Sequence, residues 1–207
     1  HDDAVLTDFE DVSPEAVAAW RQTGLGHDAA PVPQRPQERQ AWMRFKSQTL
    51  TRFTLDLRQA VQAIRGPQVK TARNLFALPI LEPQSEAWFA QNLDDFLAAY
   101  DWTVPMAMPL MESVPIDASQ AWLTRLVQAV ARHPGALKKT IFELQARDWN
   151  RRQQNAIPDQ QLADWMRLLR LNGVKNYGYY PDDFINNQPD ISRIRPQFSS
   201  WWYPDHD

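Results

Sequence analysis

The segment Asp101-Trp102-Thr103-Val104-Pro105-Met106-Ala107-Met108 is mostly apolar and is closed by Pro109. A short apolar run bounded by a proline is typical of a buried strand in a parallel sheet. Similar segments begin near residues 69, 139 and 174, so the four starts lie 32, 38 and 35 residues apart. This even spacing predicts a series of strand–helix units.

Between these segments the apolar residues recur every three to five positions, which predicts amphipathic helices. The predicted strands are 69–78, 101–108, 139–146 and 174–180. The predicted helices are 14–22, 37–65, 84–100, one capped by Asp117 and ended by His133-Pro134-Gly135, and 158–171. Eight such units form a barrel of roughly 250 residues, whereas doubly wound sheets usually have a Gly-rich first turn, absent here. We therefore predict an α/β fold, the C-terminal half to two-thirds of a (β/α)8 TIM-type barrel.

The composition narrows the classes of function. The 207 residues are 43% hydrophobic and 11% aromatic, enough for a packed core. The net charge of −3, without a run of Lys or Arg, argues against a nucleic-acid partner. The absence of Cys excludes disulfides, thiolate catalysis and Cys-ligated zinc. The start at His1, without Met or a signal-like segment, leads us to expect a fragment of a longer protein. We predict no metal and no cofactor.

The stretch from His1 to Asp11 holds five acids, and no Lys or Arg occurs before Arg21. Closely spaced carboxylates repel one another, which favours keeping one protonated beside an ionised partner. Glycoside hydrolysis uses such a pair, one group to protonate the leaving oxygen and one to assist attack on the sugar. A metal site, or an acidic loop leading into the helix at Ser13-Pro14, fits the same residues.

In barrels the chemistry lies just after the C-terminal ends of the strands. Besides the acidic stretch, the polar and aromatic residues at those positions are Arg73, Asn74, Glu112, Glu143, Gln145, Trp149, Tyr177, Tyr179, Tyr180, Asp182 and Asp183. Carboxylates beside aromatic rings predict a sugar-binding groove, because a pyranose ring offers an apolar face and hydroxyls. Each residue also has a packing interpretation: Arg73 as partner of a core acid, Glu143 as a helix contact, and Trp149 and the tyrosines as barrel-end packing.

Several motifs carry a resemblance to a known family. They are His1-Asp2-Asp3-Ala4 with Asp8-Phe9-Glu10-Asp11, Arg65-Gly66-Pro67, Lys70-Thr71-Ala72-Arg73-Asn74, Met106-Ala107-Met108-Pro109, and Asn172-Gly173-Val174-Lys175-Asn176-Tyr177-Gly178-Tyr179-Tyr180-Pro181-Asp182. Together they resemble the C-terminal glycoside hydrolase domain of the PgaB/BpsB family, the poly-β-1,6-N-acetyl-D-glucosamine N-deacetylases. The resemblance implies a periplasmic, outer-membrane-associated lipoprotein of biofilm export, with a deacetylase domain that this chain lacks, so residues 1–207 would be part of the hydrolase barrel.

The resemblance implies an endo-acting hydrolase of the partially de-N-acetylated polymer. The family's acidic triplet falls on Asp2, Asp3 and Asp8, with Asp8 resembling the catalytic residue and Glu112 or Glu143 as a second carboxylate. The implied partners are the polysaccharide, the N-terminal deacetylase domain and an outer-membrane export protein. A non-catalytic polysaccharide-binding module is the alternative. A structural interaction domain would leave the strand-end carboxylates and aromatics unexplained.

Overall fold

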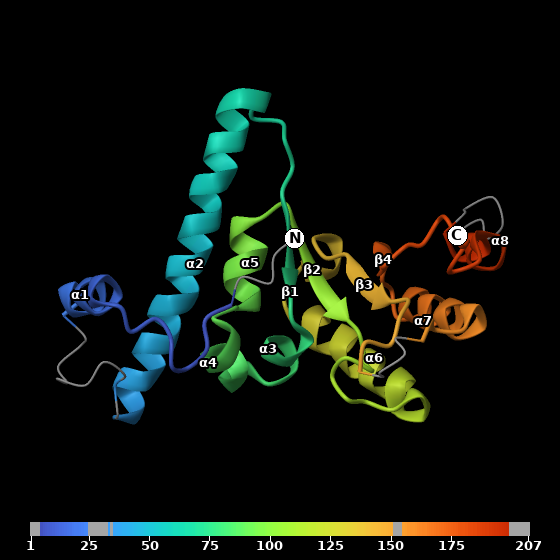
Figure 1. The fold of residues 1–207 in the computed structure, drawn as a ribbon, viewed down its shortest axis with the longest axis horizontal. Helices are drawn as coiled ribbons and strands as arrows, with labels where there is room; N and C mark the ends of the chain where they lie inside the picture. The colour runs from blue at the N-terminus through green and yellow to red at the C-terminus, as the bar shows by residue number, and fades with distance from the viewer. Residues whose placement is uncertain (1–4, 25–32, 34, 151–154, 199–207) are drawn as a thin grey trace. The chain divides into compact units, whose positions relative to one another are not determined.

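The computed structural model describes residues 5–24, 33, 35–150 and 155–198. The chain forms two compact units, His1–Thr103 and Val104–Asp207. Its strands are β1 (Ala72–Leu75), β2 (Trp102–Ala107), β3 (Phe142–Gln145) and β4 (Tyr177–Tyr180), hydrogen-bonded in the order β1-β2-β3-β4. Helices alternate with them along the chain (Figure 1). The predicted parallel α/β architecture is confirmed, with the described strands forming an open sheet.

The helical elements of the first unit are α1 (Pro14–Gln22), α2 (Pro36–Arg65), α3 (Ala77–Leu81), the short 3-10 turn η1 (Pro83–Ser85), α4 (Glu86–Phe89) and α5 (Leu93–Ala99). The Ser13 side chain accepts a hydrogen bond from Ala16 N at 3.2 Å and caps α1. Helix α2 ends at Gly66, whose φ of 96° suits glycine. The predicted starts and stops of these two helices are therefore confirmed to within a residue.

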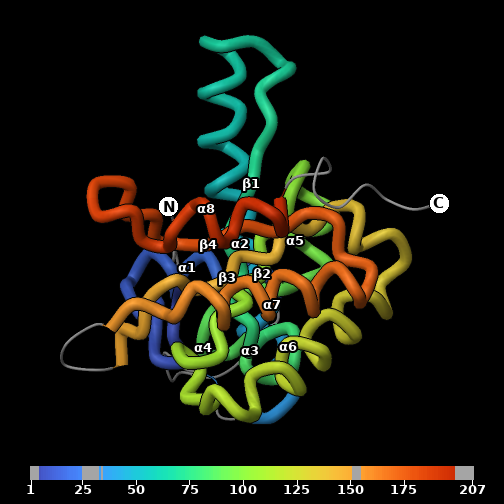
Figure 2. The backbone as a smooth tube through the Cα atoms, turned by 90° about the vertical axis from the view of Figure 1, so that its right-hand side faces the viewer, coloured from blue at the N-terminus to red at the C-terminus, as the bar shows by residue number. Residues whose placement is uncertain are grey.

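Helix α2 is buried in its first half and exposed in its second. Trp42 is buried, and its ring centroid lies 5.3 Å from that of Trp20. The later apolar residues of the same stripe are exposed: Phe53, Leu57, Val61 and Ile64. Figures 1 and 2 show the C-terminal end of α2 projecting beyond α5, with the following segment running back to β1. Only the first half of the predicted apolar stripe belongs to the core of this unit.

Two predicted elements of the first unit have different bounds. The predicted strand 69–78 is shorter, because after Leu75 the apolar run turns into α3. The predicted helix 84–100 is broken between α4 and α5, where Ala90 takes a left-handed conformation with φ of 50°. The break brings the buried Gln91 side chain inward, where it accepts a hydrogen bond from Phe76 N at 3.0 Å. Tertiary hydrogen bonding thus outweighs helical periodicity here.

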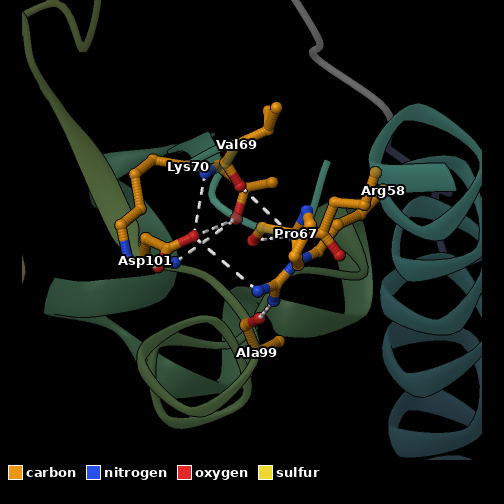
Figure 3. A network of polar contacts seen from close by, with 8 residues as sticks. Arg58, Pro67, Val69, Lys70, Ala99 and Asp101 are labelled. Carbon is orange, nitrogen blue, oxygen red and sulfur yellow. Dashed lines mark hydrogen bonds and ion pairs between the residues drawn. The ribbon is translucent and has the colours of Figure 1, made fainter. Parts of the chain in front are cut away.

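Asp101 ties α2, β1 and β2 together where the two strands begin (Figure 3). Its carboxylate accepts hydrogen bonds from Thr71 N at 2.9 Å and Lys70 Nζ at 3.1 Å. Arg58, on α2, lies 3.8 Å from the same carboxylate and donates to the Ala99 carbonyl at 3.0 Å. The Thr71 backbone hydrogen bond and the Lys70 contact lower the pKa of Asp101 to about 2. This network therefore stabilises the first unit through an ionised carboxylate.

The helical elements of the second unit are α6 (Ile116–Ala131), η2 (Ala136–Lys138), α7 (Asp159–Leu171), α8 (Ile191–Ile194) and η3 (Arg195–Gln197). Strands β2, β3 and β4 are parallel neighbours, as predicted. Trp165 of α7 is fully buried and donates from Nε1 to Ser119 Oγ of α6 at 2.8 Å, which locks the two helices together. Asp117 was predicted to cap α6, but the capping position is occupied by Pro115. Asp117 lies instead in the first turn of the helix.

None of the helices formed by the described residues is long and apolar enough to cross a membrane.

Candidate active site

Asp8 lies in an ordered turn of the acidic segment. The Glu10 amide donates to the Thr7 carbonyl at 3.1 Å, and Glu10 Oε2 accepts from Thr7 N and Oγ1, both at 3.0 Å. The backbone hydrogen bond from Thr7 is the main cause of the lowered pKa of Glu10. Asp8 is half-buried within this turn. Asp2 and Asp3, predicted to act with it, lie outside the described residues.

Lys46 of α2 anchors this turn. The residue is only 2% exposed, and its ammonium group donates to the Thr7 carbonyl and, at 3.5 Å, to that of Ala87. Burial lowers the pKa of Lys46, and the charges of Asp8 and Glu10 oppose that effect. Lys46 was not among the predicted site residues. The sequence does contain a signal for a buried lysine. Lys46 lies four residues after Trp42 and four before Leu50, on the apolar face of a predicted helix.

Asp8 also lines a cavity of about 470 Å³, within the size range of ligand pockets. Trp42, Lys46 and Glu86 are among the other lining residues. Arg44, which also lines it, binds Glu86 at 2.8 Å and Asp95 at 2.8 Å. The guanidinium group of Arg44 therefore neutralises the charge of Glu86. The charge of Asp8 interacts with the buried ammonium group of Lys46. The cavity combines an aromatic wall with paired charges and could receive a polar ring.

In the second unit the strand register groups the predicted residues by face. Glu143 pairs with Met106 on β2 and Gly178 on β4, and Gln145 pairs with Tyr180. Paired residues of neighbouring strands share a face, and alternate residues do too. Glu143, Gln145 and Tyr180 therefore lie on one face. A Cβ at Gly178 would meet no heavy atom within 4 Å, so there is open space beside Glu143.

Trp149 and Tyr180 form an aromatic pair at the C-terminal end of this face. Their ring centroids are 6.2 Å apart and their planes differ by 26°, a stacked arrangement. Tyr180, the last residue of β4, is 47% exposed, and Trp149, in the loop after β3, is half-buried. Both residues were predicted to bind substrate. Their stacked rings offer a partly exposed apolar surface against which a sugar ring can pack.

Tyr177 and Tyr179 lie on the opposite face, because they pair with Phe142 and Leu144. The Tyr177 hydroxyl donates to the Gln197 carbonyl, and that of Tyr179 donates to Asp182 Oδ1 at 2.9 Å. Burial, reinforced by Asp182, raises the pKa of Tyr179 to about 12. The ring of Phe198 lies near both tyrosines, at 5.7 and 6.0 Å. The register thus separates these two from Tyr180, although all three were predicted to bind substrate.

The two predicted residues of β1 also point to opposite faces. Arg73 is 6% exposed and donates to Thr54 Oγ1 at 3.1 Å and Tyr100 OH at 2.9 Å. Its guanidinium carbon lies 4.6 Å from the centroid of the Phe96 ring. Arg73 is therefore packed between β1 and helices α2 and α5. Asn74, the next residue, is half-buried on the other face of the strand.

Glu112 lies in the turn after β2 and is half-buried. Its amide donates to the Met108 carbonyl at 3.3 Å, and the following residue, Ser113, has a φ of 59°. The turn therefore holds Glu112 directly beyond the C-terminal end of its strand. Within the described ranges no cluster of three or more His, Cys, Asp or Glu side chains is arranged to hold a metal ion.

Comparisons with known proteins identify relatives of similar sequence and fold. The chain is 54% identical, over 208 aligned residues, to the poly-beta-1,6-N-acetyl-D-glucosamine N-deacetylases of Escherichia coli K12 and O157:H7. The match covers 100% of this chain and 31% of each relative. The glycoside hydrolase domain of PgaB (BpsB) from Bordetella bronchiseptica is 46% identical, with a TM-score of 0.89 over 96% of this chain and 55% of that one.

The match to a solved glycoside hydrolase domain, at 46% identity, identifies this parallel α/β fold as a glycoside hydrolase domain. The chain belongs to the family described as Hypothetical glycosyl hydrolase family 13, whose model matches residues 1–180. The resemblance to the PgaB/BpsB hydrolase domain and the assignment to a partial TIM-type barrel are confirmed. The chain spans about a third of the length of the curated relatives.

Proposed function

We propose that this chain cleaves internal β-1,6 glycosidic bonds of partially de-N-acetylated poly-β-1,6-N-acetyl-D-glucosamine. The observation that carries the proposal is the 54% identity, across the whole chain, to a deacetylase named for that polymer. The family match over residues 1–180 includes every described residue to which we assign a chemical role.

In the proposed reaction Asp8 acts as general acid or nucleophile on the glycosidic bond. Glycoside hydrolases work with a pair of carboxyl groups, and Glu112 or Glu143 is the proposed second member. Precise placement is needed for this chemistry. The hydrogen bonds of Thr7 to Glu10 and Lys46 support the role of Asp8, because they fix the backbone beside it.

Charge is the proposed basis of selectivity. Removing acetyl groups from the polymer exposes ammonium groups, which Asp2, Asp3 and Asp8 would attract. The stacked pair Trp149–Tyr180 would hold the apolar face of a sugar ring, with Asn74 as a further polar contact. Arg73, Tyr177 and Tyr179 were predicted to bind substrate, and their packing favours a supporting role. Fully acetylated polymer, which lacks the positive charge, would be a poor substrate.

The similarity to the deacetylases also underlies the proposed setting. We place this chain in a periplasmic protein that acts in biofilm export with an N-terminal deacetylase domain and an outer-membrane export protein. In that order of events deacetylation creates the charged sugar that the hydrolase domain recognises.

A polysaccharide-binding module without turnover is the second candidate, because the aromatic pair would serve binding alone equally well. The test is to incubate the intact protein with β-1,6-linked oligomers of defined length and to resolve the products by mass spectrometry. We expect partially de-N-acetylated oligomers to yield several intermediate lengths, while fully acetylated oligomers of equal length persist. Tight binding without any shorter product would identify the module, and release of single sugars only would contradict internal cleavage.

A further inference from the structure

Gln145 connects two backbone segments at the C-terminal end of the sheet. It is the last residue of β3 and is fully buried. Its Oε1 accepts hydrogen bonds from Leu110 N at 2.7 Å and Met111 N at 3.3 Å, in the turn after β2. Its Nε2 donates to the Arg147 carbonyl at 2.8 Å, at the start of the loop after β3. One side-chain amide therefore binds both segments.

A second link joins the same two segments. Asn150 donates from Nδ2 to the Leu110 carbonyl, and its own amide donates to Asp148 Oδ1 at 3.0 Å. Leu110 is thus held at both its N–H and its C=O. Trp149 lies between Asp148 and Asn150, so the residues on either side of this indole are hydrogen-bonded in place.

The chemistry of the position requires an amide. The turn after β2 presents two N–H donors, and the loop after β3 presents a carbonyl acceptor. A primary amide satisfies both kinds of group, whereas a carboxylate satisfies only the donors and an apolar side chain satisfies neither. Each buried group left unpaired is destabilising. Gln145 therefore meets a local demand that no apolar core residue could meet.

We propose that Gln145 is a positioning residue that fixes the turn carrying Glu112 against the loop carrying Trp149. By holding this geometry it sets where the Trp149–Tyr180 pair receives a sugar ring. The structural part of this proposal stands alone, and its effect on sugar binding rests on the proposed function.

The structural part is tested by hydrogen exchange on the intact protein. Gln145→Met should speed exchange of the Leu110 and Met111 amides roughly tenfold, because each loses its acceptor. Gln145→Glu keeps the acceptor and should retain most of the protection, which guards against a general loss of folding in the Met variant. Gln91→Met is the matched control, since Gln91 is equally buried and accepts from Phe76 N in the first unit. Unchanged protection of both amides in Gln145→Met overturns the proposal.

The effect on binding is tested by a double-mutant cycle with a partially de-N-acetylated β-1,6 oligomer as the probe. Gln145→Met should weaken binding roughly tenfold in the parent and very little in a Trp149→Ala background, because it acts through Trp149. Equal losses in both backgrounds contradict that route, and a loss shared by Gln91→Met indicates general destabilisation. If the parent binds no oligomer, the proposed function fails, while the exchange experiment still decides the positioning role.

Discussion

Lys46 Nζ donates a hydrogen bond to the carbonyl oxygen of Thr7, the residue immediately before Asp8. Lys46 is almost fully buried, so this ammonium group has left water for partners inside the protein. The charges of Asp8 and Glu10 compensate part of that cost. The conformation of the acidic turn therefore depends on a residue of α2 that lies far from it in the sequence.

Replacing this tether should impair catalysis more than binding. Lys46→Met removes the donor to Thr7, and we expect kcat on the de-N-acetylated polymer to fall roughly 100-fold, because small displacements of a catalytic group have large effects. Lys46→Arg should restore part of the rate. Lys70→Met is the control, since Lys70 is an exposed partner of Asp101 outside the acidic turn. Parent-like kcat for Lys46→Met would show that the turn holds its position without the lysine.

The Asp101 network predicts a specific acid sensitivity. Hydrogen bonds from Thr71 and the contact with Lys70 lower the pKa of Asp101 from 3.8 to about 2, so the folded state binds this proton less readily than the unfolded state. Its contribution to stability is therefore present above about pH 4 and is lost as the pH falls toward 2. Asp101→Asn should lower the melting temperature at pH 7 and flatten its decline between about pH 4 and 2.

Thermal melts at a series of pH values measure this effect. Asp56→Asn, at an exposed position of α2, should keep the parent profile. If Asp101→Asn keeps that profile too, the network does not stabilise the fold.

Local sequence patterns predicted most elements but not their interruptions. Helices α2, α6 and α7 were predicted because their apolar residues recur at helical spacing over a long stretch, and a strand does not have that spacing. The break at Ala90 depends on Gln91 reaching Phe76, a contact across the fold that periodicity does not record. The change from β1 to α3 falls within one apolar run, and such a run suits a strand or a buried helix equally.

Substitutions of the two tyrosines at the end of β4 should have different effects, because Tyr179 and Tyr180 lie on opposite faces of the sheet. Tyr180→Ala and Trp149→Ala should each weaken binding of de-N-acetylated oligomers roughly tenfold, because each removes half of the stacked pair. Tyr179→Ala should leave binding within a few-fold and instead lower the melting temperature, since it loses contacts with Asp182 and Phe198. Calorimetric titration and thermal melts of the three variants check both expectations. Weakened binding with an unchanged melting temperature for Tyr179→Ala would place that ring in the groove.

Residue type alone led us to propose part of the candidate site. Glu143, Trp149 and Tyr180 were proposed from their positions at strand ends, and Asp8 from the acidic stretch and the family resemblance. Adjacent residues of a strand face opposite sides, so Tyr179 and Tyr180 must differ. Which of the two shares a face with Glu143 depends on the strand register, and the sequence of one strand does not determine that register. Gln145 makes three hydrogen bonds to backbone groups of two loops, and Lys46 makes two to distant carbonyls. A lone amide or ammonium group has no sequence pattern that predicts such contacts.

Cleavage of a defined, partially de-N-acetylated β-1,6 oligomer by Asp8→Asn, measured in the intact protein, tests the central claim most directly. The amide keeps the shape of the side chain but cannot exchange the catalytic proton, so we expect the rate to fall at least roughly 100-fold while oligomer affinity changes only a few-fold. Asp11→Asn removes a neighbouring charge, from a side chain that accepts from Ser13 N, and should cleave close to the parent rate. Parent-rate cleavage by Asp8→Asn would contradict the assignment of Asp8 as the catalytic carboxylate.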